Sequence, residues 1–98
     1  MKHHPLLGLW IVMVDDPATE QGRGPLVGRA DDDLFVLGFR DVRRARACAE
    51  QAGGGNPVLI VQANVGDISS ALAKQGISGV IVDWMPGQPT IEEAHSLI

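Results

Sequence analysis

The sequence predicts an α+β domain, close to the α/β type, in which helices cover a mixed five-stranded sheet. Three observations support this prediction. Short apolar runs of strand length recur along the chain, Gly, Pro and Asp separate them, and two polar segments carry apolar residues at the spacing of a helical face. The predicted order is three strands, a helix, a strand, a helix, a strand and a short terminal helix, with the helices in a single layer. The 98 residues suffice for a single domain, residues 1–98.

The first half of the chain contains three predicted strands. Residues 9–14 are apolar at every position and end at Asp15-Asp16-Pro17, which predicts a buried central strand. The runs at 25–29 and 34–39 follow, and only the aspartates at 31–33 separate the second from the third. Because so short a connection permits only antiparallel pairing, we expect these strands to form a meander.

Residues 41–52 have the composition of a helix and end at the glycines 53–55. The apolar residues at helical spacing include Ala45, Cys48 and Ala49, so this face is narrow and would let the helix approach a sheet closely. The glycine run precedes a strand instead of a helix, so it is a helix stop and not a phosphate-binding loop.

A strand, a helix and a second strand are predicted next. Residues 57–61 and 77–82 are β-branched runs bounded by turn residues. Between them, Asn64 is placed to cap a helix, Asp67 completes an approximate capping box, and Gly76 fits the position after the last turn. The connection is long enough for a right-handed crossover between parallel strands.

The last helix is predicted from Thr90-Ile91-Glu92-Glu93, which matches a capping box. It would turn Ile91, Ala94 and Leu97 inward.

This arrangement leaves apolar sheet surface to be covered. The runs at 9–14 and 58–61 are apolar on both faces, yet two short helices and a terminal stub do not cover both sides of a five-stranded sheet. We therefore expect a homodimer that buries the second face or an edge, with Trp10, Phe35 or Phe39 near the contact. The alternative is that the terminal helix closes that face within one chain.

Composition limits the classes of partner. The chain is 45% hydrophobic and 20% charged, with a formal net charge of −4, which does not fit a protein that binds DNA through basic residues. The apolar run at 6–14 is too short to cross a bilayer and lacks the features of a secretory signal. The single cysteine, Cys48, excludes an internal disulfide. We expect a cytoplasmic protein.

Four segments taken together resemble the amino-terminal domain of the SseB family. They are LWIVMVDD, LFVLGFRDVRRARACAEQA, NPVLIVQANVGDISSALAKQGISGVIVDWMPG and PTIEEAHSL, which follow one another in a similar order and at similar spacing. The resemblance covers residues 9–97 and rests on apolar patterning. It implies a bacterial protein of a family without an assigned catalytic centre, which favours a non-enzymatic function.

A cluster of arginines is the first candidate site. Arg40, Arg43 and Arg44 lie at the start of the first predicted helix, where the helix dipole disfavours cations, so they could bind an anion. Alternatively, nearby carboxylates neutralise them on a solvated face; these are Asp31, Asp32, Asp33, Asp41 and Glu50.

The carboxyl ends of the two later strands form the second candidate site, because ligands often bind at this edge of open sheets. The candidate ligand-binding residues are Asn64, Gly66, Asp67, Asp83 and Trp84. Alternatively, Asn64 and Asp67 are only helix caps, and Trp84 only closes the end of the sheet.

No catalytic residue, metal site or cofactor motif is predicted. Cys48 lies among alanines, as expected of a buried, unreactive thiol. His3, His4 and His95 are too dispersed to predict a zinc site.

Two functions follow from the sequence. The preferred one is a small non-catalytic protein-interaction module, homodimeric or bound to another protein through an apolar sheet face or edge. The alternative is a domain that binds, or acts on, a small anionic metabolite at the carboxyl ends of the parallel strands.

Overall fold

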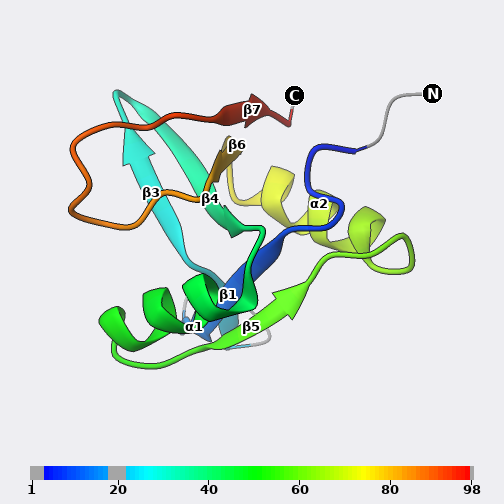
Figure 1. Ribbon diagram of the computed structural model, residues 1–98. Coiled ribbons are helices and arrows are strands. Elements are labelled where there is room, and N and C mark those ends of the chain that lie inside the picture. Colours follow the sequence, from blue (N-terminus) through cyan, green and yellow to red (C-terminus); the bar gives the residue numbers. More distant parts are fainter. Residues whose placement is uncertain (1–3, 18–21, 98) are drawn as a thin grey trace.

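The protein folds as the α+β domain that the sequence predicts, with a mixed sheet and two helices (Figure 1). The structure, a computed structural model, describes residues 4–17 and 22–97. Its elements are β1 (Trp10–Asp15), β2 (Arg23–Pro25), β3 (Val27–Ala30), β4 (Asp33–Phe39), α1 (Val42–Gln51), β5 (Asn56–Leu59), α2 (Val65–Lys74), β6 (Ile77–Val82) and β7 (Ala94–Ser96). The two helices predicted inside the chain are confirmed, and the terminal helix is replaced by a strand.

The main path of the sheet runs β2-β1-β4-β6-β7, and β5 pairs with β1 as well. β1 is central, as predicted, because β5 lies along one of its edges while β4 and β2 share the other. β4 and β6 are the one parallel pair among the strands of residues 4–17 and 22–97.

The predicted meander is present in a modified form. β1 and β4 pair directly only at Trp10 with Phe39 and Ile11 with Gly38. Beyond this point they separate, and β2 pairs with β1 while β3 pairs with β4, each antiparallel. Leu26 sits at the bend between β2 and β3 and bonds to both sides: its N–H donates to the Val12 carbonyl at 2.8 Å, and its carbonyl accepts from Leu37 N–H at 3.2 Å.

β5 and β6 point in the same direction, but two strands lie between them. β5 is antiparallel to β1, β1 is antiparallel to β4, and β4 is parallel to β6. The predicted strand-helix-strand unit is therefore a crossover between strands that are not neighbours. The run at 58–61, read as buried on both faces, belongs to β5 and the turn after it, and Leu59 is 37% exposed.

Each face of the sheet is covered by one helix, so the predicted single layer of helices is wrong. Residues alternate between the faces along the central strands. On one face α2 packs through Val65, Ile68 and Leu72 against Ile11, Val36, Val80 and Val82. On the other, α1 packs through Ala45, Cys48 and Ala49 against Val12, Leu37, Phe39 and Ile81. Each helix has ten residues, and neither is long and apolar enough to span a membrane.

The chain before β1 packs on the same face of the sheet as α2, and its Leu6 is fully buried there. The sheet face that we expected a second chain to bury is therefore covered from within. Phe39 is fully buried beneath α1 and offers no surface to a partner, whereas Trp10 and Phe35 are half-buried at the border of the same cluster. The homodimer itself stays a prediction that a single chain does not test.

The carboxyl-terminal segment forms β7 along the edge of β6. Val82 N–H donates to the Glu93 carbonyl at 2.9 Å, and Leu97 N–H donates to the Ser78 carbonyl at 2.9 Å. A short helix would have left the backbone groups on this edge of β6 without a strand partner, whereas β7 satisfies them. The capping-box pattern at Thr90 is therefore overridden by pairing with a distant strand.

Candidate functional site

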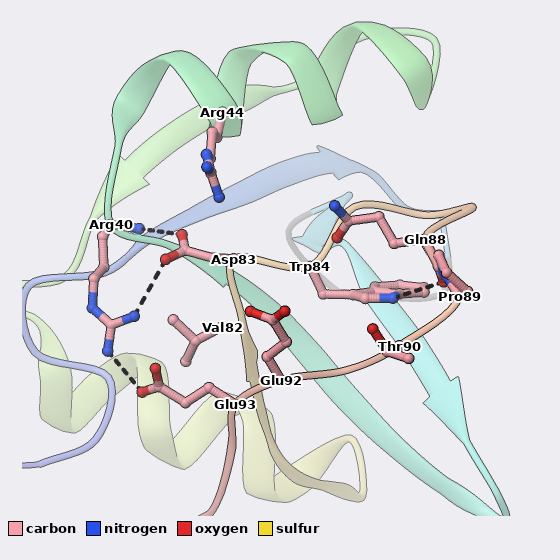
Figure 2. A pocket seen from close by; sticks show the side chains of 10 residues that line it. All are labelled: Arg40, Arg44, Val82, Asp83, Trp84, Gln88, Pro89, Thr90, Glu92 and Glu93. Carbon is pink, nitrogen blue, oxygen red and sulfur yellow. Dashed lines mark hydrogen bonds and ion pairs between the residues drawn. The ribbon is translucent and has the colours of Figure 1, made fainter.

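A cavity of about 540 Å³ opens where β4 and β6 end and α1 begins (Figure 2). Three segments form its walls: the chain from the end of β4 into α1, the end of β6, and the loop that leads to β7. The residues that line it are Arg40, Arg44, Val82, Asp83, Trp84, Gln88, Pro89, Thr90, Glu92 and Glu93. The carboxyl ends of parallel strands meet here, at the position where open sheets commonly bind ligands.

Asp83 ties the ends of β4 and β6 together. Its N–H donates to the Gly38 carbonyl at 2.8 Å, and its Oδ1 accepts from Arg40 N–H at 3.0 Å. Its φ of 57° lies in the left-handed region, which Asp adopts more readily than most residues. The next residue, Trp84, packs against the cluster beneath α1 and forms one wall of the cavity.

Arg40 links the two strands to the segment before β7. Its Nη1 lies 3.2 Å from Asp83 Oδ2, and its Nη2 lies 2.7 Å from Glu93 Oε2. The same Glu93 oxygen is 2.7 Å from His95 Nε2. The hydrogen bonds from Arg40 and then His95 lower the pKa of Glu93 from 4.5 to about 2. The bond to Glu93 in turn raises the pKa of Arg40.

Arg44 and Glu92 are different, because their side chains have no hydrogen bond or ion pair within the described part of the chain. Arg44 points from α1 toward the cavity, and Glu92 points into it from the opposite wall, beside Asp83 and Trp84 (Figure 2). Both side chains are exposed. A cation and an anion are thus free to contact a bound molecule from two sides.

The loop after β6 is held by its own hydrogen bonds. Trp84 Nε1 donates to the Gln88 carbonyl at 3.2 Å, and Gln88 Oε1 accepts from Met85 N–H at 2.9 Å. Because the indole N–H is bonded within this loop, it is not free to bond to a molecule in the cavity.

The structure separates the predicted ligand-binding residues into two groups. Asp83 and Trp84 line the cavity, as expected for the end of a parallel strand. Asn64, Gly66 and Asp67 do not line it, because they begin α2, which follows β5, and β1 and β4 lie between β5 and β6.

Asn64 occupies the N-cap position of α2, but its side chain makes no capping bond. Instead its Oδ1 accepts from Val61 N–H at 2.8 Å, and its Nδ2 donates to the Leu59 carbonyl at 3.1 Å. The predicted capping role of the Asn64 side chain is therefore wrong, and it closes the turn after β5. Gly76 follows α2 with a φ of 75°, as its predicted place requires.

The predicted anion patch is largely neutralised. Arg40 bonds to two carboxylates, and Arg43 bonds to Asp41, which is also the N-cap of α1 and accepts from Arg43 N–H at 2.8 Å. The Asp41 pKa is lowered, first by this backbone bond. Of the three predicted arginines, Arg44 alone faces the cavity without an ion pair among the described residues.

Several cavity residues were not predicted from the sequence. Gln88, Glu92 and Glu93 line the cavity, but Glu92 and Glu93 belong to the predicted terminal helix, and no role is predicted for Gln88. Their one signal in the sequence is that they follow the end of β6, so a chain that turned back along the sheet would place them beside Asp83.

No group of three His, Cys, Asp or Glu side chains within residues 4–17 and 22–97 is arranged to hold a metal ion. Cys48 is fully buried, and burial raises the pKa of its thiol, which keeps it protonated and unreactive at neutral pH.

Comparisons with known proteins add no functional assignment: no family model matches the sequence, and no curated protein matches it. The resemblance to the SseB amino-terminal domain stays a prediction.

Proposed function

We propose that this domain binds a small polar metabolite in the cavity at the ends of β4 and β6, and that Arg44 holds an anionic group of the ligand. The observation that carries the proposal is the cavity itself, with a guanidinium that has no ion pair within the described chain at its mouth. Its volume of about 540 Å³ is within the range of small-molecule sites.

The position of Arg44 favours an anion for two physical reasons. A guanidinium donates paired hydrogen bonds that match carboxylate and phosphate oxygens. Arg44 also lies in the first turn of α1, where the helix dipole disfavours a cation unless a negative charge is near. Asp41 supplies part of that charge from the N-cap, and a bound anion would supply more.

The proposed function is binding. Arg40 holds the carboxylates of Asp83 and Glu93 in ion pairs, so these two groups hold the site together and are not free to contact a ligand. The wall formed by Trp84 and Gln88 provides contact surface and hydrogen-bonding groups, which suit recognition.

A thermal-stability screen tests this function. We expect some carboxylated or phosphorylated small molecules to raise the melting temperature of the protein, and Arg44→Gln to abolish the rise. Arg46→Gln is the matched control, because Arg46 is exposed on the same helix and does not line the cavity. A rise that Arg44→Gln leaves unchanged would contradict the proposed site.

The homodimeric interaction module is the second candidate. Leu59, at the end of β5, and Val61, two residues later, are apolar side chains that are 37% and 41% exposed and that a partner could cover. We rank it second because one helix lies on each face of the sheet.

A further inference from the structure

We infer that the ligand of this cavity is zwitterionic: its carboxylate binds Arg44, and a cationic amine binds between Glu92 and the ring of Trp84. The inference rests on the proposed function and narrows it from any small anion to the class of amino acids.

The charges that line the cavity support a ligand with both signs. Arg40 carries one positive charge and faces two carboxylates, Asp83 and Glu93, so this group keeps a negative charge when His95 is neutral. Arg44 and Glu92 add one charge of each sign. The lining is therefore acidic in sum, and a phosphate or a dicarboxylate on Arg44 would be repelled by the carboxylates around it.

A positively charged group on the same ligand removes this conflict. Glu92 has no ion pair among the described residues and points into the cavity beside Trp84 (Figure 2). An ammonium at this point would donate a charge-assisted hydrogen bond to the carboxylate and could make a cation–π contact with the indole ring. The indole N–H is already bonded to the Gln88 carbonyl, so Trp84 can contribute to this contact only through its ring.

Substitutions of Arg44 and Glu92 should have different effects, because each removes the partner of a different group on the ligand. Arg44→Gln deletes the partner of the carboxylate and should weaken every anionic ligand. Glu92→Gln keeps the size of the side chain but deletes the partner of the amine. It should therefore weaken zwitterions while leaving plain carboxylates unchanged or slightly tighter.

The experiment measures dissociation constants by calorimetry for three matched series of unbranched compounds. The first series is the ω-amino acids from glycine to 6-aminohexanoate, the second the monocarboxylates of equal length, and the third the monoamines. A series is used so that one member matches the separation of Arg44 and Glu92. We expect the best ω-amino acid to bind about tenfold or more tighter than the carboxylate and the amine of its own length.

Binding to the variants then distinguishes the possible results. We expect Glu92→Gln to bring the best ω-amino acid to the affinity of the matching carboxylate, and Glu50→Gln, an exposed control on α1 outside the cavity, to change nothing. If carboxylates bind as tightly as ω-amino acids and still depend on Arg44, the zwitterion is wrong and the proposed site stands. If no compound of any series binds, this inference fails, and if the compounds bind independently of Arg44, the proposed function fails with it.

Discussion

Arg40 is the residue on which the geometry of the cavity depends. Its backbone N–H and its guanidinium both bond to Asp83, and the guanidinium also reaches Glu93, so one side chain fixes the ends of β4 and β6 and the segment before β7. Exposed ion pairs contribute little one at a time, but a network with a shared guanidinium orders several segments at once. Arg40 therefore shapes the site without being free to bind a ligand.

The Glu93 carboxylate gives this network a pH dependence that can be measured. Its pKa in the folded protein is about 2, below the ordinary value of 4.5, because Arg40 and His95 stabilise its charge. A lowered pKa means that the stabilisation is complete above about pH 4.5 and is lost as the pH falls toward 2. We expect Glu93→Gln to lower the free energy of unfolding at pH 7, and the difference from the wild type to shrink across this interval, as followed by urea denaturation.

Glu92→Gln is the matched control for this experiment, because Glu92 is the neighbouring carboxylate and has no ion pair in the described chain. A difference between Glu93→Gln and the wild type that stayed constant from pH 7 to pH 2 would show that the ion pairs do not stabilise the folded state.

Residue roles were predictable from the sequence where they depend on nearby residues. Asp83 and Trp84 were placed at the end of a strand because the apolar run before them ends there, and Asp41 is at the start of its helix. The bond between Arg40 and Glu93 joins residues 53 positions apart, and no local pattern indicates it. The same limit applies to Asn64, whose side chain turned out to bond to the strand before it instead of the helix after it.

Helices and strands, like the roles of single residues, were predictable where the local sequence pattern decides them. The helices α1 and α2 carry apolar residues at helical spacing, and the strands β1, β4 and β6 are short apolar runs bounded by turn residues. The segment of β7 also fits a helical pattern, and the free edge of β6 decided between the two. Pairing with an edge is a property of the assembled sheet, so short terminal segments are where sequence patterns are weakest.

The pairing of β6 with β7 leaves no room for a side chain at position 79, and a substitution of Gly79 tests this. A methyl group at this position would run into the backbone carbonyl oxygen of His95 on β7 and would lie 2.8 Å from the Phe35 ring. Because backbone cannot yield as a flexible side chain does, we expect Gly79→Ala to displace β7 and to lower the free energy of unfolding by about 1–3 kcal/mol, measured by urea denaturation.

Gly66→Ala provides the contrast. Gly66 lies in the first turn of α2, and an added methyl group there would meet no atom within 4 Å. Alanine favours a helix more than glycine does, so we expect this variant to gain up to about 1 kcal/mol. Equal effects of the two substitutions would contradict the close approach of β7 to Gly79.

At the scale of the whole molecule, the connections decide how the sheet is covered. α1 leads from β4 to β5 on one face, and α2 leads from β5 to β6 on the other, so two helices of ten residues each cover both sides of the central strands. The numbers of predicted helices and strands do not reveal that the helices lie on opposite faces. The face on which each crossover lies depends on strand order. Strand order was the part of the fold that the sequence left undetermined.

Because a helix covers each face of the sheet, we expect a monomer, in contrast to the homodimer that the sequence favoured. The exposed large apolar side chains of the described residues are Val27, Leu59, Val61 and Ile91, which come from three separate segments and do not include an open sheet face. A stable dimer needs a contact of roughly 1,000 Å² or more with an apolar centre. Light scattering should therefore give particles of 10.4 kDa, and the melting temperature should not change between about 1 and 100 μM protein.

A particle of twice that mass, with a melting temperature that rises with protein concentration, would show that the protein is a dimer. The pair Leu59→Ser and Val61→Ser would then locate it. The outer edge of β5 is blocked in part, since Pro57 lacks an N–H and the Asn64 side chain bonds to the Leu59 carbonyl and the Val61 N–H. A dimer that used this end of the sheet would therefore be held by the two exposed side chains and not by strand pairing, and the double variant would return it to a monomer.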